Sequence, residues 1–283
     1  MRRLFAQIAF FLLQNPFMGN FAAGSIHMGE TKRFCSPGLN CYSCPAAAFS
    51  CPIGSLQNFL RGAQRSISLF VVGFLMATAA FFGRFICGFV CPMGLVQDLI
   101  YRVPTKKLIV RMRILSYLKY VVLMLFVILL PLTIRDHIEI GGAHFFLDGQ
   151  AWFCAYICPS GTIFAAWPLA LANDAVRGML GVMFNIKTVI ALGLLTAALF
   201  INRFFCRVLC PLGAIYALFN KVSFIQINFN KSNCDGCKKC NKACQLALNP
   251  ITETTHSDCV RCGSCVRSCE EKALVYGTVL TKF

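Results

Sequence analysis

Eight cysteines near the C-terminus have the spacing that most clearly predicts chemistry. They form two runs in which successive cysteines are separated by two, two and three residues: Cys234, Cys237, Cys240 and Cys244, then Cys259, Cys262, Cys265 and Cys269. Sets of four thiolates bind zinc or hold iron–sulfur clusters. Because the complete run occurs twice in tandem, we favour iron–sulfur chemistry, with a pair of zinc sites as the alternative.

These runs resemble those of bacterial dicluster ferredoxins, in which the fourth cysteine of each run binds the other cluster. The resemblance implies two [4Fe-4S] clusters with crossed ligands: Cys234, Cys237, Cys240 and Cys269 for one, and Cys259, Cys262, Cys265 and Cys244 for the other. Gln245 and Glu270 stand where such runs usually have proline, which changes the backbone but removes no ligand. The region is too small for a large core, so we expect its fold to depend on its metal.

A second set of cysteines lies in the apolar part of the chain. In Cys87/Cys91, Cys154/Cys158 and Cys206/Cys210, three residues separate two thiols and proline follows the second, while Cys51-Pro52 is a fourth Cys-Pro pair. Proline suits the first position of a helix, so we expect these pairs to begin helices whose positive ends face a thiolate or a cluster. Buried free cysteines are the alternative, and four Cys-Pro-x-Gly copies argue against it.

Two further clusters follow from this pattern. Cys87, Cys91, Cys206 and Cys210 come from equivalent loops and are expected to hold one [4Fe-4S] cluster, and Cys44, Cys51, Cys154 and Cys158 to hold another. Cys35 and Cys41 are left over. Either could replace Cys44, the two could form a disulfide, or Cys35, Cys41, Cys44 and Cys51 could bind a cluster alone. No catalytic residue is predicted.

The composition indicates what positions these cysteines. Apolar residues make up 57% of the chain and charged residues 13%, which is typical of a membrane protein. Four segments have about the length that crosses a bilayer: Leu4–Gly24, Ser66–Phe85, Ile114–Ile134 and Phe184–Asn202. The first also fits a signal peptide, but we interpret it as a span. The predicted fold is an α-helical membrane domain with an internal two-fold repeat, residues 1–222, followed by an α+β ferredoxin-like module, residues 223–283.

The formal charge of +16 has an uneven distribution. The side that would carry both termini has 12 basic residues in its loops and the other side has 7, leaving the module aside. The positive-inside rule therefore predicts a cytoplasmic module in an inner (plasma) membrane protein. No nucleic-acid-binding motif accompanies the charge, so nucleic acid is not an expected partner. Arg84 and Arg203, three residues before ligand pairs, could stabilise a cluster, but we favour the positive-inside explanation.

Membrane Cys-x3-Cys-Pro pairs followed by a dicluster ferredoxin resemble the NapH/NosR-type membrane polyferredoxins. The similarity runs from about Ser66 to the C-terminus, and the chain differs in its added loop Cys35–Cys51 and in lacking the flavin domain of the NosR type. The resemblance implies an electron-transfer subunit of a membrane oxidoreductase complex. Its expected partners are a cytoplasmic ferredoxin or dehydrogenase, an outer flavoprotein or cytochrome, and membrane lipid.

Three other functions use the same clusters. The chain could exchange electrons with the quinone pool. It could reduce metal during assembly of another redox enzyme, like the CcoG-type membrane ferredoxins, although its methionines form no metal motif. It could also belong to an ion-pumping complex, which would require more ionisable residues inside the spans.

Overall fold

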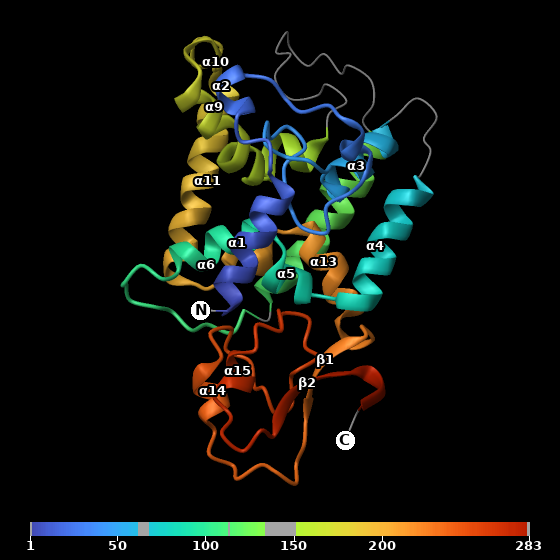
Figure 1. The fold of residues 1–283 in the computed structure, drawn as a ribbon, viewed down its shortest axis with the longest axis vertical. Helices are drawn as coiled ribbons and strands as arrows, with labels where there is room; N and C mark the ends of the chain where they lie inside the picture. Colours follow the sequence, from blue (N-terminus) through green and yellow to red (C-terminus); the bar gives the residue numbers. More distant parts are fainter. Residues whose placement is uncertain (1, 62–67, 113, 134–150, 282–283) are drawn as a thin grey trace.

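The computed structural model describes residues 2–61, 68–112, 114–133 and 151–281. Helices dominate residues 2–222, the helical part, which lies above the small C-terminal module of residues 223–281 in Figure 1. The N-terminus lies near the boundary between the two, and α1, α4 and α11 run along the long axis of the molecule (Figure 1).

The helical elements, in chain order, are α1 (Arg2–Gln14), α2 (Asn20–Ala23), η1 (Glu30–Arg33), α3 (Pro52–Arg61), α4 (Leu69–Phe82), α5 (Phe85–Phe89), α6 (Pro92–Ile100), η2 (Leu115–Tyr117), α7 (Leu118–Val122), η3 (Leu123–Leu129), α8 (Leu130–Thr133), η4 (Phe153–Ile157), η5 (Thr162–Ala166), α9 (Trp167–Ala172), α10 (Asp174–Gly178), α11 (Val182–Phe200), α12 (Phe204–Val208), α13 (Pro211–Leu218) and η6 (Phe219–Lys221). The module contains β1 (Ile225–Phe229), α14 (Lys239–Ala243), α15 (Ser264–Arg267), β2 (Leu274–Thr278) and η7 (Val279–Thr281).

Two stretches of the described residues are helical, apolar and long enough to cross a membrane. They are Leu115–Thr133, which joins η2, α7, η3 and α8, and Val182–Phe200, which is α11. The other two predicted spans correspond to shorter helices, Arg3–Gln14 and Leu69–Phe82. Ser66, Ile67 and Ile134, at the edges of predicted spans, lie outside the described residues.

The first predicted span ends early for a local reason. Pro16 has no backbone N–H and disfavours the helical conformation in the residue before it, so α1 ends at Gln14. The polar residues of this segment are buried against protein. Gln7 and Gln14 donate side-chain hydrogen bonds to the carbonyls of Gly88 (3.0 Å) and Val90 (2.8 Å).

Three helices begin at the proline of a Cys-Pro pair. Pro52, Pro92 and Pro211 are the first residues of α3, α6 and α13. The cysteine before each of the last two has an extended backbone, as a residue flanking a helix N-terminus does. The fourth pair, Cys158-Pro159, precedes the helical stretch that begins at Ser160.

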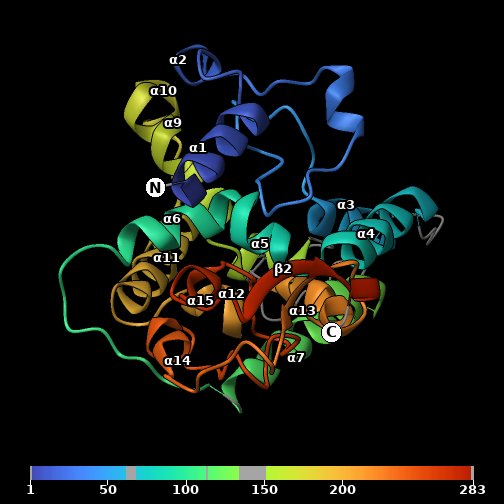
Figure 2. The same ribbon diagram turned by 60° about the horizontal axis from the view of Figure 1, so that its bottom comes forward.

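The module is built on a two-stranded antiparallel sheet. In β1 and β2 Ile225 lies opposite Thr278 and Phe229 opposite Leu274, and α14 and α15 pack beside the sheet. Ile227 and Leu274 are buried in its small core. Seen from the module's side, β2, α14 and α15 lie in front of α12 and α13 (Figure 2).

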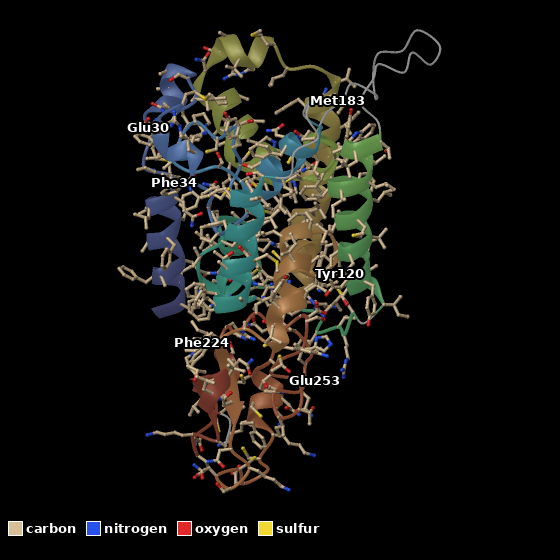
Figure 3. The ribbon with its side chains drawn as sticks, turned by 90° about the vertical axis from the view of Figure 1, so that its right-hand side faces the viewer. Glu30, Phe34, Tyr120, Met183, Phe224 and Glu253 are labelled. Atoms are coloured by element: carbon tan, nitrogen blue, oxygen red, sulfur yellow. The ribbon has the colours of Figure 1, made fainter. Side chains whose placement is uncertain are left out.

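Buried polar contacts join the module to the helical part. Asp258 of the module accepts hydrogen bonds from Lys119 (2.7 Å) and Arg84 (3.3 Å), and all three side chains are buried. Figure 3 labels Tyr120 on the helical side of this junction, and Phe224 and Glu253 on the module side. The module is therefore held against the helices through its Asp258 loop.

Candidate iron–sulfur centres

The eight module cysteines gather into two groups of four. The first module group lines one pocket and consists of Cys234, Cys237, Cys240 and Cys269. The second module group lines another and consists of Cys244, Cys259, Cys262 and Cys265. The fourth cysteine of each run thus lies with the first three of the other run, which is the crossed arrangement that the sequence predicts.

Burial keeps the thiols of Cys259 and Cys265 in the second module group protonated in the absence of metal. It raises the pKa of Cys259 to about 11 and that of Cys265 to about 12, with neighbouring thiols adding to both shifts. Iron binds the thiolate form, so loading this group must release protons. The donor set suits a [4Fe-4S] cluster, which takes one thiolate per iron.

A third group, here called the proximal group, lies in the helical part next to the module. It consists of Cys87, Cys91, Cys206 and Cys210, all buried. Cys206 lies close enough to Cys87 and Cys91 for their charges to interact. Cys210 lies close enough to interact with all three of the others. Cys91 and Cys210 precede α6 and α13, so the positive ends of two helices face the group. The backbone N–H of Gly213 lies 3.3 Å from the Cys210 Sγ.

A fourth group, here called the distal group, lies farther from the module. Its members line a cavity of about 660 Å³ and are Cys41, Cys51, Cys154 and Cys158. Cys41 lies close enough for its charge to interact with those of the other three, Cys51, Cys154 and Cys158. Met183, labelled near the upper end of the helical part in Figure 3, lines the same cavity.

The distal group contains Cys41 where the sequence favours Cys44. The Cys44 Sγ lies 3.8 Å from Asn15 Oδ1, and Cys44 does not line the cavity, although it is near Cys41. Cys35 pairs with Ser50 in an isolated bridge and is also outside the cavity. Of the three candidates that the sequence leaves open, Cys41 is thus the one that lines the cavity.

Two arginines cross between the halves of the proximal group. Arg84 donates to the carbonyl of Cys206 (2.7 Å), and Arg203 donates to the carbonyl of Cys87. Both are fully buried, and Arg203 also forms an ion pair with Asp98 (2.6 Å). These contacts place two permanent positive charges beside the thiols. From the sequence, the positive-inside rule was the favoured explanation of both arginines, and a place beside a cluster was the alternative.

Two buried glutamines contact thiols, Gln97 and Gln57. Neither was predicted from the sequence. The Gln97 Nε2 lies 2.9 Å from the Cys206 Sγ, and the Gln57 Nε2 lies 3.2 Å from the Cys154 Sγ. Each glutamine stands six residues after a Cys-Pro cysteine, Cys91 or Cys51. This equal spacing from a Cys-Pro cysteine was the one sequence feature that could have indicated their role. A single glutamine in a helix does not by itself indicate a contact with sulfur.

Close contacts join the proximal group to the second module group on one side and to the loop of the distal group on the other. Next to Cys87, Gly88 approaches the module so closely that a Cβ on it would lie 2.5 Å from the Val260 carbonyl oxygen. Val260 follows Cys259 of the second module group. On the other side, the backbone N–H of Leu39 lies 3.3 Å from the Cys91 Sγ, and Leu39 is two residues before Cys41.

Among the residues that the structure describes, no three His, Cys, Asp or Glu side chains converge on a single metal ion. A [4Fe-4S] cluster does not require such convergence, because each of its irons takes one cysteine.

Comparison with known proteins agrees with the thiol pattern. A family model described as a 4Fe-4S binding domain matches residues 65–111, 143–168 and 188–232, which contain all three Cys-x3-Cys-Pro pairs. An uncharacterized protein of Methanocaldococcus jannaschii is 27% identical over 243 residues, which are 82% of this chain and 88% of the relative. YccM of Escherichia coli, provisionally named as an electron transport protein, is 27% identical over 78% of this chain and 57% of its own length.

The ferredoxin-type protein NapH of Haemophilus influenzae is 31% identical over 84 residues, which are 26% of this chain and 29% of NapH. Together these matches support a place among the NapH/NosR-type polyferredoxins. The chain is therefore an iron–sulfur electron-transport protein that contains [4Fe-4S] clusters. No solved structure matches this polyferredoxin.

Proposed function

We propose that this polyferredoxin relays electrons across the inner (plasma) membrane through four [4Fe-4S] clusters. The relay would connect a cytoplasmic donor, such as a ferredoxin or dehydrogenase, with a flavoprotein or cytochrome at the outer face. The observation that carries the proposal is the series of thiol groups. The second module group adjoins the proximal group where Gly88 meets Val260, and the Leu39 N–H joins the Cys91 thiol to the loop that carries Cys41 of the distal group.

The membrane location rests on large apolar side chains that are exposed in the described part of the chain. They occur on all three of the longer helices: Leu69, Phe70, Met76 and Phe81 of α4, Val121, Met124 and Leu129 of the Leu115–Thr133 helix, and Val182, Val189 and Leu192 of α11. A belt of this kind is costly in water and favourable in lipid. We propose that α1 and α4 complete a domain of four spans with an internal two-fold repeat.

The close approach of the proximal and distal groups supports transfer between them. Leu39 contacts Cys91, and two residues of chain cover at most about 7 Å, so Cys41 lies near the proximal group. The hydrocarbon layer is about 30 Å thick. With two centres this close together inside the protein, the distance of each electron transfer would be shorter than the thickness of the layer.

A double substitution tests the relay. Cys91→Ser with Cys210→Ser should remove the proximal cluster and leave the other three assembled. In sealed vesicles, a donor on the module's side should still reduce the module clusters but should no longer reduce an impermeant acceptor on the opposite side. Cys35→Ser is the matched control, since Cys35 is buried but belongs to none of the four groups. Wild-type transfer in the double variant would exclude the relay.

A second candidate, exchange with the quinone pool, is favoured by the cavity of the distal group. Leu169, Leu180, Met183 and Phe184 line it together with the four thiols, giving an apolar space next to a redox centre. Reduction of the distal cluster by an added quinol, in protein whose module clusters have been removed, would support this candidate over a protein partner.

A further inference from the structure

Gln97 makes three hydrogen bonds that fix its side-chain amide. Its Nε2 donates to the carbonyl of Met93 (3.2 Å), one turn earlier in α6, and to the Cys206 Sγ (2.9 Å). Its Oε1 accepts from the backbone N–H of Phe205 (3.1 Å), the residue before that cysteine. The side chain is 1% exposed, so water does not compete for these partners.

Gln57 repeats the same three contacts at the distal group. Its Nε2 donates to the carbonyl of Ile53 (3.3 Å) and to the Cys154 Sγ (3.2 Å). Its Oε1 accepts from the backbone N–H of Phe153 (3.0 Å), again the residue before the contacted cysteine. The two other Cys-Pro helices have Phe164 and Tyr216 at the equivalent sixth position, so each group receives one glutamine.

The direction of each amide follows from its partners. A backbone N–H can only donate, and a backbone carbonyl can only accept. Rotating the Gln97 amide by 180° would set its NH₂ against the Phe205 N–H and its oxygen against the Met93 carbonyl and the Cys206 sulfur. The observed orientation is therefore the one in which an N–H faces the sulfur, and the same holds at Gln57.

We propose that Gln97 and Gln57 set the reduction potentials of the proximal and distal clusters by donating an N–H to one ligand sulfur of each. This inference rests on the proposed function, because it requires clusters at both groups. Reduction adds negative charge to a cluster, and hydrogen bonds to its sulfurs stabilise that charge and raise the potential. In a buried site the effect is larger than in water. The glutamines are positioning and tuning residues rather than ligands.

Redox titration followed by electron paramagnetic resonance tests the proposal. Gln97→Met keeps a long side chain and a good helix former but removes the donor. The midpoint potential of the proximal cluster should fall. At a fixed potential, the ratio of reduced to oxidised cluster should decrease about tenfold. For a one-electron couple this change equals a fall of about 59 mV in the midpoint potential. Gln57→Met should shift the distal cluster alone. The module clusters serve as internal references in both variants.

Gln226→Met is the matched control. Gln226 is also 1% exposed and donates to the carbonyls of Lys221 and Ser223, but no thiol contact is found for it in the described part of the chain. Its substitution should leave all four potentials unchanged. Unchanged proximal and distal potentials in Gln97→Met and Gln57→Met, with four clusters present, would overturn the inference while leaving the relay intact. A wild-type protein with only the two module clusters would instead overturn the proposed function.

A measurement on the wild-type protein covers the case in which the variants do not assemble. Protein with ¹⁵N in its glutamine side-chain amides should show a ¹⁵N coupling to the reduced proximal and distal clusters in pulsed electron paramagnetic resonance. The coupling should be absent when only the backbone nitrogens carry ¹⁵N at glutamine. Absence of the side-chain coupling at both clusters would overturn the proposal.

Discussion

The backbone N–H of Leu39 lies 3.3 Å from the Sγ of Cys91, across 52 positions of sequence. At the same place, a Cβ on Gly38 would lie 2.8 Å from the Cα of Cys91. The segment from Cys35 to Cys51, which the sequence predicts to supply ligands only to the outer cluster, therefore also reaches the proximal group. Two residues further on, it supplies Cys41 to the distal group.

The first prediction separates Cys41 from Cys44. Cys41→Ser should remove the distal cluster and lower the iron content from about 16 to about 12 atoms per chain, because each [4Fe-4S] cluster holds four irons. Cys44→Ser should leave about 16, since the Cys44 side chain faces Asn15 and not the cavity. Iron analysis of anaerobically purified protein measures both. Loss of iron in Cys44→Ser with none in Cys41→Ser would reverse the assignment.

The second prediction concerns the close approach at Gly38. Gly38→Ala adds a methyl group that meets backbone atoms of Cys91, so the loop must move away and lose the Leu39 hydrogen bond. We expect a lower midpoint potential for the proximal cluster and slower transfer to the distal cluster. Gly73→Ala in α4 is the control, because a Cβ there meets no atom within 4 Å. Equal behaviour of the two variants would show that the contact has no effect.

The spacing of cysteines predicts some of these sites and not others, for a physical reason. Within a run such as Cys234 to Cys244, short loops confine the thiols, so the spacing alone limits what they can bind. Cys41 and Cys44 are three residues apart in an irregular loop, and long-range packing against Asn15 and the cavity decides between them. Local sequence does not contain that information.

The glutamines illustrate the same limit. The partner of Gln97 lies 109 residues away and that of Gln57 lies 97 residues away, so their role depends on the arrangement of the halves. Helix starts at Cys-Pro pairs were predictable because they depend on proline itself. Helix ends were harder to predict. The apolar character of Leu4–Gly24 suggested one span, but the restriction that Pro16 places on the backbone ends the helix at Gln14.

The third prediction is that the module faces the cytoplasm. It follows from the excess of basic residues on the module's side, 12 against 7. Lys231 is exposed in a turn between β1 and α14, so it offers a protease site without unfolding. Protease added to intact cells should leave the module uncut, whereas inverted vesicles should release it. Cleavage after Lys231 from outside intact cells would reverse the orientation of the relay.

The last prediction tests how Asp258 holds the module to the helices. Burial disfavours the Asp258 carboxylate, but Arg84 and Lys119 outweigh that effect and lower its pKa, so the group is ionised at neutral pH. Asp258→Asn leaves two buried cations without their counter-charge, and breaking a buried ion pair in this way costs about 3–5 kcal/mol. The module should then dissociate from the helical part at a lower temperature, while its own cluster signals persist. Glu253→Gln is the control, because its partner Arg111 is 37% exposed and such a surface pair contributes about 0–1 kcal/mol. Protease sensitivity of the junction, measured against temperature, compares the two variants. If both junctions open at the same temperature, Asp258 does not hold the module in place, and the other buried contacts of the junction must do so.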